Sequence, residues 1–403
     1  MIKNPAVPPD SPYLRHAAER GVRIDTDIGV FLDKARAVTP NIIGVTGTKG
    51  KSTTAALIHR IFSGVFGGVV LGGNITVPVL SLLDGLQRNA YVVLELSSFQ
   101  LGGIRGKTFS PRVAVFTNFF EDHLNYYRSM EDYFEDKSVL FRFQGEGDAL
   151  VANREDPGLA ALSANDGVKR FSFGFGGSFR GGGSYISGEE IRFRVPEGDD
   201  RFVMSVRETN LRGTHNLYNV LAAVAAAMSE GIPPGAVSEA VRSFGGIPHR
   251  LEYLGEWRSI AFYNDTAATV PDAAVRGVSS FDGPLTLIAG GADKGLPLES
   301  FARTILERVG ELVLLEGSGT GRLLDSLGRA AGKSPGALPV PCRVFDSLEK
   351  AFAHSCRVTP PGGTVLLSPG FASFGMFKNE FDRGNRFKTL VKELIGTHEE
   401  GSK

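Results

Sequence analysis

Short apolar, β-branched runs alternate with helical segments along most of the chain. In the first half this pattern predicts strands over 41–46, 91–96, 112–117 and 149–152, and helices over 51–63, 129–143 and 216–230. In the second half it predicts strands over 259–263, 285–289, 311–315 and 363–367, separated by helices. Alternation of this kind is typical of parallel sheets with crossover helices, so we predict an α/β fold.

The sequence pattern changes over 164–210, where glycine-rich segments and segments of alternating apolar and polar residues replace the α/β pattern. The alternation over 185–195 predicts short antiparallel strands appended to the first sheet. A glycine run over 173–183 lacks the strand–turn–helix context of a nucleotide loop, so we expect a flexible hairpin connection there. The glycines and proline of 245–248 predict a boundary between two α/β domains.

A second glycine-rich turn, GSGTG over 317–321, follows a predicted strand and opens a predicted helix. It has the form of a Rossmann turn. Most turns of this form serve only close packing of strand against helix, and we expect that role here. The sequence contains no evident internal repeat.

Composition narrows the class of protein. A length of 403 residues predicts two or three domains, and 44 basic against 44 acidic residues give no field that would recruit nucleic acid or an anionic membrane. Two cysteines form neither a disulfide framework nor a metal-ligand pattern. The longest strongly apolar run, at 220–228, is too short to span a membrane, and residues 1–20 have no apolar signal-peptide core. We therefore expect a soluble, reduced, cytoplasmic protein without membrane insertion.

The strongest chemical signal is a glycine-rich loop between the predicted strand 41–46 and the predicted helix 51–63. Such a turn aims backbone N–H groups and a helix N-terminus at one spot, which suits a polyphosphate. Lys51 would reach the outer phosphates, and Ser52 or Thr53 would offer a hydroxyl to Mg²⁺. Gly44 precedes Gly50 by six residues instead of the usual five, yet the flanking elements favour an ATP site. The loop residues predicted to bind ATP are Gly47, Thr48, Lys49, Gly50, Lys51, Ser52 and Thr53.

Two further groups follow apolar strands. Glu95 ends the strand 91–96, and His123 lies shortly after the strand 112–117. The carboxyl ends of parallel strands gather at one edge of a sheet, where ligands bind. Carboxylate and imidazole groups there would serve as ligands of Mg²⁺.

Nine motifs together resemble the Mur ligase family of ATP-dependent amide-bond-forming enzymes of peptidoglycan synthesis. They appear in family order with family-like spacing and cover about 41–390. The most specific are LELSSFQL and LSPGFASFGMFKN. In chain order the motifs are TGTKGKST (46–53), GGNITVP (72–78), LELSSFQL (94–101), TNFFEDHL (117–124), THNLYN (214–219), PHRLE (248–252), NDTAAT (264–269), GGADKG (290–295) and LSPGFASFGMFKN (367–379).

The resemblance implies a role for each matching residue. Lys51 and its loop would bind the ATP phosphates, Ser52 and Glu95 would hold one Mg²⁺, and His123 would hold a second. Lys137 matches the family's carbamylated lysine, in which CO₂ added to a neutral amine creates a carboxylate-like metal ligand. The residues that would hold the adenosine are Asn216, Asn219, Arg250 and Asp265. Those that would lie at the substrates are Asn74, Ser97, Thr269, Lys294 and Ser373, of which the last three would grip D-glutamate.

The resemblance also implies a reaction. D-Glutamate would be joined to UDP-N-acetylmuramoyl-L-alanine in two steps, through an acyl phosphate made from ATP. The C-terminal domain would close over the central one before reaction, and the protein would act as a monomer. The implied domains are a remnant of a UDP-sugar-binding domain at 1–40, a central ATP-binding domain at 41–246 and a Rossmann-like domain at 247–403.

The chain departs from the family pattern at three places. Ala267 stands where the family typically has lysine, which removes a positive charge near the substrates. The acidic and aromatic residues of 379–381 are in the reverse of the usual order, so a family role does not transfer to Glu380. Residues 4–31 resemble only the end of the sugar-binding domain, as its last proline-rich loop, helix and strand, which suggests a shortened expression product, a misplaced start codon or a natural truncation.

Two alternatives stay open on the sequence. A folylpolyglutamate synthase also has its phosphate loop near the N-terminus and adds glutamate to a carboxylate, although the two most specific motifs oppose it. An ATP-binding pseudoenzyme or regulatory module would account for Ala267 and the short N-terminal region.

Overall fold

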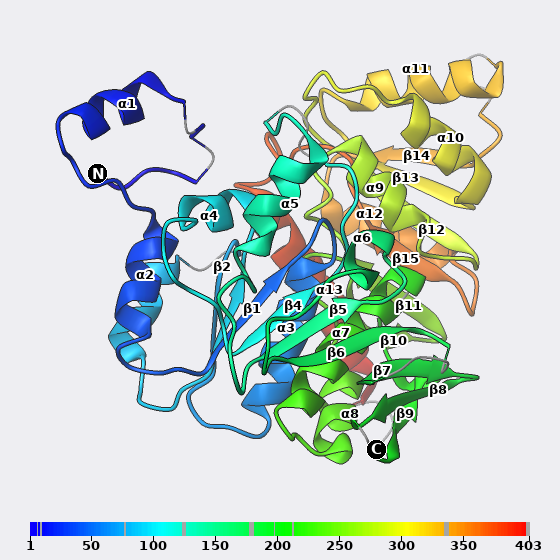
Figure 1. The fold of residues 1–403 in the computed structure, drawn as a ribbon. Helices are drawn as coiled ribbons and strands as arrows, with labels where there is room; N and C mark the ends of the chain where they lie inside the picture. The colour runs from blue at the N-terminus through cyan, green and yellow to red at the C-terminus, as the bar shows by residue number, and fades with distance from the viewer. Residues whose placement is uncertain are drawn as a thin grey trace. The chain divides into compact units, whose positions relative to one another are not determined.

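The computed structural model describes residues 1–5, 7–8, 10–75, 78–122, 126–176, 181–196, 198–211, 213–333 and 338–399. The chain forms two compact units. The first comprises Met1–Asn210 and Thr214–Phe244, and the second comprises Leu211–Gly213 and Gly245–Lys403. Each unit contains one sheet, and both sheets can be followed in Figure 1.

The first unit is built on a nine-stranded sheet in the order β2-β3-β1-β4-β5-β6-β7-β8-β9. Neighbouring strands run parallel from β2 to β7, and β8 and β9 follow in antiparallel pairing. The prediction of a mostly parallel sheet with short antiparallel strands is therefore confirmed. The strands are β1 Ile42–Thr46, β2 Val70–Gly73, β3 Val92–Glu95, β4 Val113–Phe116, β5 Ala149–Asn153, β6 Lys169–Phe175, β7 Gly182–Ser187, β8 Glu190–Arg194 and β9 Asp200–Ser205.

Two of the three helices predicted by bounds in this unit match closely, and further helices occur that the pattern did not single out. The helix predicted over 129–143 ends at Ser138, because the chain then turns and sends Val139 and Leu140 into the core. The helices are α1 Pro12–Glu19, α2 Asp27–Ala35, α3 Lys51–Ser63, α4 Ser98–Gly103, α5 Met130–Ser138, α6 Pro157–Ala160, α7 Thr214–Ser229 and α8 Pro234–Arg242, with the 3₁₀ helices η1 Val79–Gly85 and η2 Val206–Glu208.

Burial explains the continuous apolar runs. All residues of β1, β3, β4 and β5 are buried, as expected for parallel strands covered on both faces. Helix α7 packs against α3 and is buried from Asn219 to Met228, which accounts for the longest apolar run of the sequence. This packing holds helix α3 against the sheet, so the glycine loop between β1 and α3 is anchored at both ends. No helix among the described residues is long and apolar enough to cross a membrane.

The hairpin expected at the glycine run was wrong. Strands β6 and β7 flank this run and pair in parallel, whereas a hairpin would make them antiparallel. The glycines instead permit a close approach of the two backbones, since a Cβ on Gly183 would lie 1.8 Å from the Ser172 carbonyl oxygen. Glycine content indicated a turn here without indicating its direction. Residues 177–180 lie outside the described part of the chain.

The N-terminal segment forms part of the first unit's core. Thr26 Oγ1 caps α2 by accepting a hydrogen bond from Gly29 N, and Ile28 and Phe31 pack in the same apolar cluster as Leu94 of β3. The strand expected from the resemblance is reduced, in the described residues, to a single parallel bridge between Ile2 and Asp25.

The second unit has a six-stranded sheet in the order β10-β11-β15-β12-β13-β14, parallel except for β10. Side chains alternate between its two faces: Leu312 packs with α9, α10 and α11, and Val313 packs with α12 and α13. The strands are β10 Glu252–Trp257, β11 Ile260–Asn264, β12 Leu285–Gly290, β13 Glu311–Leu315, β14 Cys342–Phe345 and β15 Thr364–Leu367. The helices are α9 Pro271–Val278, α10 Glu299–Arg308, α11 Thr320–Ala331, α12 Leu348–Val358 and α13 Glu380–Glu399.

The GSGTG turn allows close packing, as expected. It joins β13 to α11, and a Cβ on Gly317 would lie 2.4 Å from the carbonyl oxygen of Gly291. A Cβ on Gly319 would lie 2.4 Å from the ring of Phe371. Glycine is therefore required at both positions by protein atoms alone.

Candidate functional site

The glycine loop between β1 and α3 has a geometry that only glycine adopts readily. Gly47 has φ 147° and Gly50, the residue before the helix, has φ 81°. A Cβ on Gly47 would lie 1.9 Å from Thr117 Oγ1, and one on Gly50 would lie 2.2 Å from Asn219 Oδ1. The loop is therefore held between β4's end and α7, with the N-terminus of a 13-residue helix behind it.

The segment after β4 is hydrogen-bonded to this loop and fixes its conformation. Thr117 Oγ1 donates to the Lys49 carbonyl at 2.6 Å, and Thr48 N donates to the Asn118 carbonyl at 2.9 Å. Lys49 N donates to the Asn118 side chain at 2.8 Å. Sequence reasoning singled out this TNFFEDHL segment for His123, but its first two residues prove to shape the phosphate loop.

Lys51 folds back over the loop, where its Nζ donates to the carbonyls of Gly47 and Thr48 at 3.0 Å. Ser52 and Thr53 are half-buried in the first turn of α3. A cationic Nζ, a helix N-terminus and two hydroxyls thus lie within one turn, which is the chemistry that a nucleotide phosphate requires.

Glu95 lies at the end of β3, the neighbour of β1, and is only 1% exposed. Its Oε1 accepts a hydrogen bond from Asn74 Nδ2 at 3.1 Å, and its Oε2 is buried with no hydrogen-bond partner among the described residues. A buried carboxylate oxygen without a donor is costly unless a cation meets it, so this oxygen fits a Mg²⁺ ligand. Ser97, which was predicted to lie at the substrates, caps helix α4 in a capping box with Gln100.

Lys137 is buried in the last turn of α5 with 1% of its surface exposed. Its Nζ donates to the Gly47 carbonyl at 2.8 Å and lies 4.7 Å from the ring centre of Tyr133. In the described part of the chain, no carboxylate lies within ion-pair distance of this Nζ. Burial, and next the nearby charge of Lys51, lower the pKa of Lys137 well below its usual value. The amine is thus biased toward the neutral form that reacts with CO₂.

The predicted metal ligand His123 lies outside the described residues. Within the described ranges no three His, Cys, Asp or Glu side chains form a metal-binding group. The ligands that fit here are Glu95, which alone does not make such a group, together with a hydroxyl of α3 and a carbamate on Lys137, all of which would present oxygen.

Asn216 and Asn219 share one buried face of α7. Asn219 Nδ2 donates to Asn216 Oδ1 at 3.0 Å, and Thr54 Oγ1 of α3 donates weakly to Asn219 Oδ1 at 3.4 Å. Asn219 Oδ1 also lies against Gly50, where a Cβ would come within 2.2 Å of it. Asn219 therefore contacts both the phosphate loop and α3, in addition to the adenosine role that the resemblance implied.

In the second unit, Asp265 follows β11 and is buried. It accepts hydrogen bonds from Ser368 Oγ at 2.7 Å and from Leu251 N at 3.1 Å. Burial raises the pKa of this carboxyl to about 7, against the opposing effect of those bonds. Asp265 thus fixes the backbone next to Arg250, whose side chain is exposed.

The PHRLE turn around Arg250 is strained. His249 and Leu251 both have positive φ, at 69° and 44°, which is uncommon for residues other than glycine. A buried network holds the turn: Glu252 Oε2 accepts from His249 N at 2.8 Å and from Asn264 Nδ2 at 3.2 Å. Strain that the surroundings enforce is typical of functional sites.

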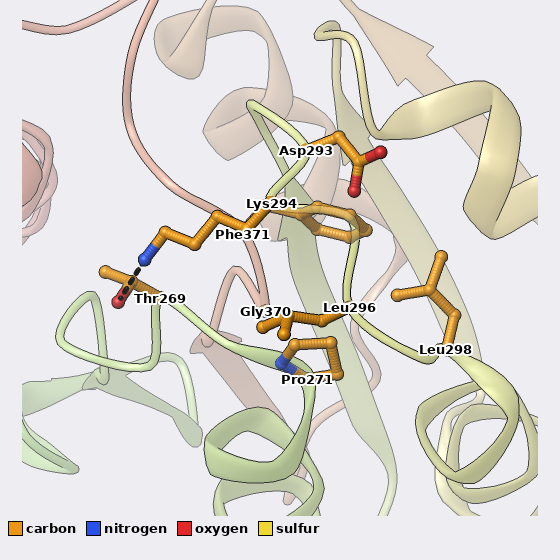
Figure 2. Close-up of a pocket in the computed structure, with 8 residues that line it drawn as sticks. All are labelled: Thr269, Pro271, Asp293, Lys294, Leu296, Leu298, Gly370 and Phe371. Carbon is orange, nitrogen blue, oxygen red and sulfur yellow. Dashed lines mark hydrogen bonds between the residues drawn. The ribbon is translucent and has the colours of Figure 1, made fainter.

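Thr269, Lys294 and Ser373 come from three loops at the carboxyl ends of β11, β12 and β15. Lys294 Nζ donates to Thr269 Oγ1 at 3.2 Å, as Figure 2 shows. The two residues line a hollow with Phe371, and the segment of Ser373 is joined to that of Lys294 by the antiparallel bridge between Ala292 and Ala372. The remaining residues lining the hollow are Pro271, Asp293, Leu296, Leu298 and Gly370.

Comparison with known proteins decides the family. The profile of the Mur ligase middle domain matches residues 45–227. The UDP-N-acetylmuramoylalanine–D-glutamate ligase of Roseiflexus sp. (strain RS-1) is 39% identical over 98% of this chain and 84% of its own length, and that of Symbiobacterium thermophilum is 36% identical over similar shares. The chain belongs to the Mur ligase family. Members of this family are ATP-dependent acid–amino-acid ligases, so the predicted enzyme class is confirmed.

Solved Mur ligases share the fold. The UDP-N-acetylmuramate–alanine ligase MurC of Thermotoga maritima has a TM-score of 0.59 at 21% identity, covering 97% of this chain and 85% of that one. The MurF ligase of the same organism, in complex with ADP, has a TM-score of 0.57 at 17% identity, covering 96% and 92%.

This Mur ligase contains a functional candidate that sequence reasoning missed. Arg383 of α13 is fully buried and bonds three carbonyl or hydroxyl oxygens: Nε donates to Thr266 Oγ1 at 2.9 Å, and its Nη atoms donate to the carbonyls of Thr266 and Phe371. Burial lowers its pKa to about 10. Arg383 ties together the loops of Thr269 and Ser373. An arginine within a helix carries no sequence signal of such burial.

Two residues at which this Mur ligase departs from the family pattern, Ala267 and Glu380, make backbone hydrogen bonds in the structure. Ala267 is half-buried, and its N–H donates to the His249 carbonyl at 2.9 Å. Glu380 begins α13, and its carbonyl oxygen accepts from Thr266 Oγ1 at 3.1 Å. The contact that Glu380 makes with Thr266 therefore uses its backbone carbonyl and not its side-chain carboxylate.

Proposed function

We propose that this Mur ligase joins D-glutamate to UDP-N-acetylmuramoyl-L-alanine, with hydrolysis of ATP to ADP and phosphate, in the cytoplasm. The observation that carries the proposal is the buried group formed by the glycine loop, Glu95 and Lys137, in a chain whose relatives bear the name of that ligase. The reaction has two steps. The acceptor carboxylate attacks the γ-phosphate of ATP to give an acyl phosphate and ADP, and the amine of D-glutamate then displaces phosphate to form the amide.

The phosphate loop binds and orients ATP in this proposal. Its N–H groups and the N-terminus of α3 donate to the phosphates, and Lys51 exchanges its loop carbonyls for phosphate oxygens. The charge on the transferred phosphoryl group is then met by groups already in position, which is the main source of catalysis in such transfers. The proposed adenosine ligands are Asn216, Asn219, Arg250 and Asp265.

Mg²⁺ would neutralise phosphate charge when bound, and Ser52, Glu95, His123 and Lys137 are its proposed ligands. Glu95 Oε2 is a buried oxygen without a donor among the described residues, and the neutral amine of Lys137 can be carbamylated to give another oxygen ligand. We expect two ions, as the family resemblance implied.

The hollow of the second unit is the proposed D-glutamate site. Lys294 would pair with a side-chain or α-carboxylate, and Thr269 and Ser373 would offer hydroxyls to the same ligand. Asn74 and Ser97 remain proposed contacts of the acceptor. Ala267 supplies no cation, so Lys294 is the proposed cation of the hollow.

The proposal is tested by incubating the chain with Mg-ATP, D-glutamate and UDP-N-acetylmuramoyl-L-alanine, and following both phosphate release and the amide product. Lys51→Ala should lower kcat about 100- to 1,000-fold, because a cation aimed at the transferred phosphoryl group is removed. Lys34→Ala, at an exposed lysine of α2, is the matched control and should retain full activity.

Three results would contradict the proposal. Formation of γ-glutamyl folate without a muramoyl product would favour the folylpolyglutamate synthase alternative. Tight Mg-ATP binding without turnover on any acceptor would favour a pseudoenzyme. Unchanged turnover in Lys51→Ala would remove the loop from the mechanism.

A further inference from the structure

The loop that carries Lys294 is held by the GSGTG turn. Gly319 N donates to the Gly291 carbonyl at 3.0 Å, and Ser318 Oγ accepts from Asp293 N at 3.0 Å. The close contact of Gly317 with Gly291 fixes the same segment from the side. The turn found in the sequence therefore positions the substrate loop of the proposed D-glutamate site.

Arg322, in the first turn of α11, completes this support. Its Nη1 donates to both carboxylate oxygens of Asp293 at 2.6 Å, and its Nη2 donates to the Leu296 carbonyl at 3.2 Å. One guanidinium thus spans the loop on both sides of Lys294. Asp293 Oδ1 also accepts from Gly295 N at 3.0 Å, so the carboxylate closes a local turn.

The position of Asp293 matters because it immediately precedes Lys294. An unrestrained aspartate next to a lysine can pair with its ammonium and compete with any carboxylate ligand. Figure 2 shows the Asp293 carboxylate turned away from the Lys294 side chain, which extends toward Thr269. In the described part of the chain, Lys294 makes no ion pair. The Arg322 bonds lower the pKa of Asp293. An aspartate released from these bonds is still ionised at neutral pH, so it would be an effective competitor.

We propose that Arg322 is a positioning residue that sequesters Asp293 and thereby keeps the Lys294 ammonium available to the carboxylate of the incoming amino acid. This inference rests on the proposed function, since it takes the hollow of Thr269 and Lys294 as the D-glutamate site. Arg322 itself does not touch the substrate. Its removal should raise the KM for D-glutamate and leave kcat nearly unchanged.

The experiment compares steady-state kinetics of four forms: Arg322→Gln, Asp293→Asn/Arg322→Gln, the control Arg329→Gln and Lys294→Ala. Arg329 is an exposed arginine near the end of the same helix. We expect Arg322→Gln to raise the KM for D-glutamate about three- to tenfold, the range for an exposed ion pair with added hydrogen bonds, with the KM for ATP within about twofold of wild type. The added Asp293→Asn removes the competing charge while an amide oxygen still accepts from Gly295, so the double variant should recover at least half of that loss.

The double variant separates sequestration from simple loop support. If Arg322 only held the loop, the double variant would bind D-glutamate no better than Arg322→Gln, and that result would overturn the inference. An unchanged KM in Arg322→Gln, as in Arg329→Gln, would also overturn it while the proposed function stands. An unchanged KM in Lys294→Ala would instead reject the proposed D-glutamate site, and the inference with it.

Discussion

Burial changes the chemistry of Lys137. A surface lysine is almost fully protonated and does not react with CO₂, whereas Lys137 is buried, close to Lys51 and without an ion-pair partner among the described residues. The same burial makes an ammonium at this position unfavourable. A carbamate resolves that cost only if cations meet it, and Lys51 and Mg²⁺ are the proposed cations.

Replacing Lys137 with alanine tests the carbamate. We expect Lys137→Ala to lower kcat by about 100-fold, because a metal-site ligand is lost, and we expect millimolar formate or acetate to restore part of the activity by supplying a carboxylate. Incubation of the wild-type chain with ¹³C-labelled bicarbonate should also give a carbamate signal by NMR that is absent in the variant.

The control for this rescue is Lys51→Ala, where a lost cation cannot be replaced by a carboxylate. Rescue of both variants would indicate a general salt effect. Failure of small carboxylates to restore Lys137→Ala, with a native circular dichroism spectrum, would reject the carbamate.

At the scale of single elements, the loop between β1 and α3 was recognisable because its sequence and its geometry agree. The strand, the glycines and the helix of 42–63 all match their prediction, and α3 has the predicted bounds. The contacts of Thr117, Asn118 and Asn219 with this loop could not be predicted, because residues 68 or more positions apart meet only through the sheet order and the packing of α7 on α3.

Gly50 offers a test at this scale. Gly50→Ala combines a positive φ with a Cβ 2.2 Å from Asn219 Oδ1, so α7 or the loop must shift. We expect Mg-ATP affinity to fall at least tenfold and the free energy of unfolding to fall by about 2 kcal/mol. Isothermal titration and chemical denaturation measure the two effects.

Gly21→Ala is the matched control. Gly21 has a similar φ of 68°, but apart from its chain neighbours no atom of the described residues lies within 4 Å of the point that an alanine methyl would occupy, so only the backbone cost of about 1 kcal/mol applies. ATP affinity should be unchanged in this variant. Equal effects of the two substitutions on affinity would show that the contact with Asn219 is irrelevant.

At the scale of the whole molecule, the alternation of apolar strands and helical segments was sufficient to predict two α/β domains, each with one sheet. Most predicted strands match within one or two residues, because buried parallel strands are continuous apolar runs. The direction of β7 relative to β6 was not predictable, because glycines indicate where the backbone can turn or approach closely but not which strand pairs with which. The buried network of His249, Glu252 and Asn264 likewise depends on tertiary contacts that no local pattern encodes.

Arg250 is a proposed adenosine ligand, and its removal gives the last prediction. Arg250→Ala should weaken the binding of a non-hydrolysable ATP analogue about tenfold although the phosphate loop is untouched, because a charged hydrogen bond is lost. Titration calorimetry measures this affinity.

The same substitution should reduce the rise in melting temperature that the analogue causes by about 3–5 °C at saturating analogue. Unfolding can be monitored by the fluorescence of Trp257, the single tryptophan of the chain. Arg303→Ala, at an exposed arginine of α10, should behave as wild type. Wild-type affinity in Arg250→Ala would mean that Arg250 is not a ligand of the nucleotide.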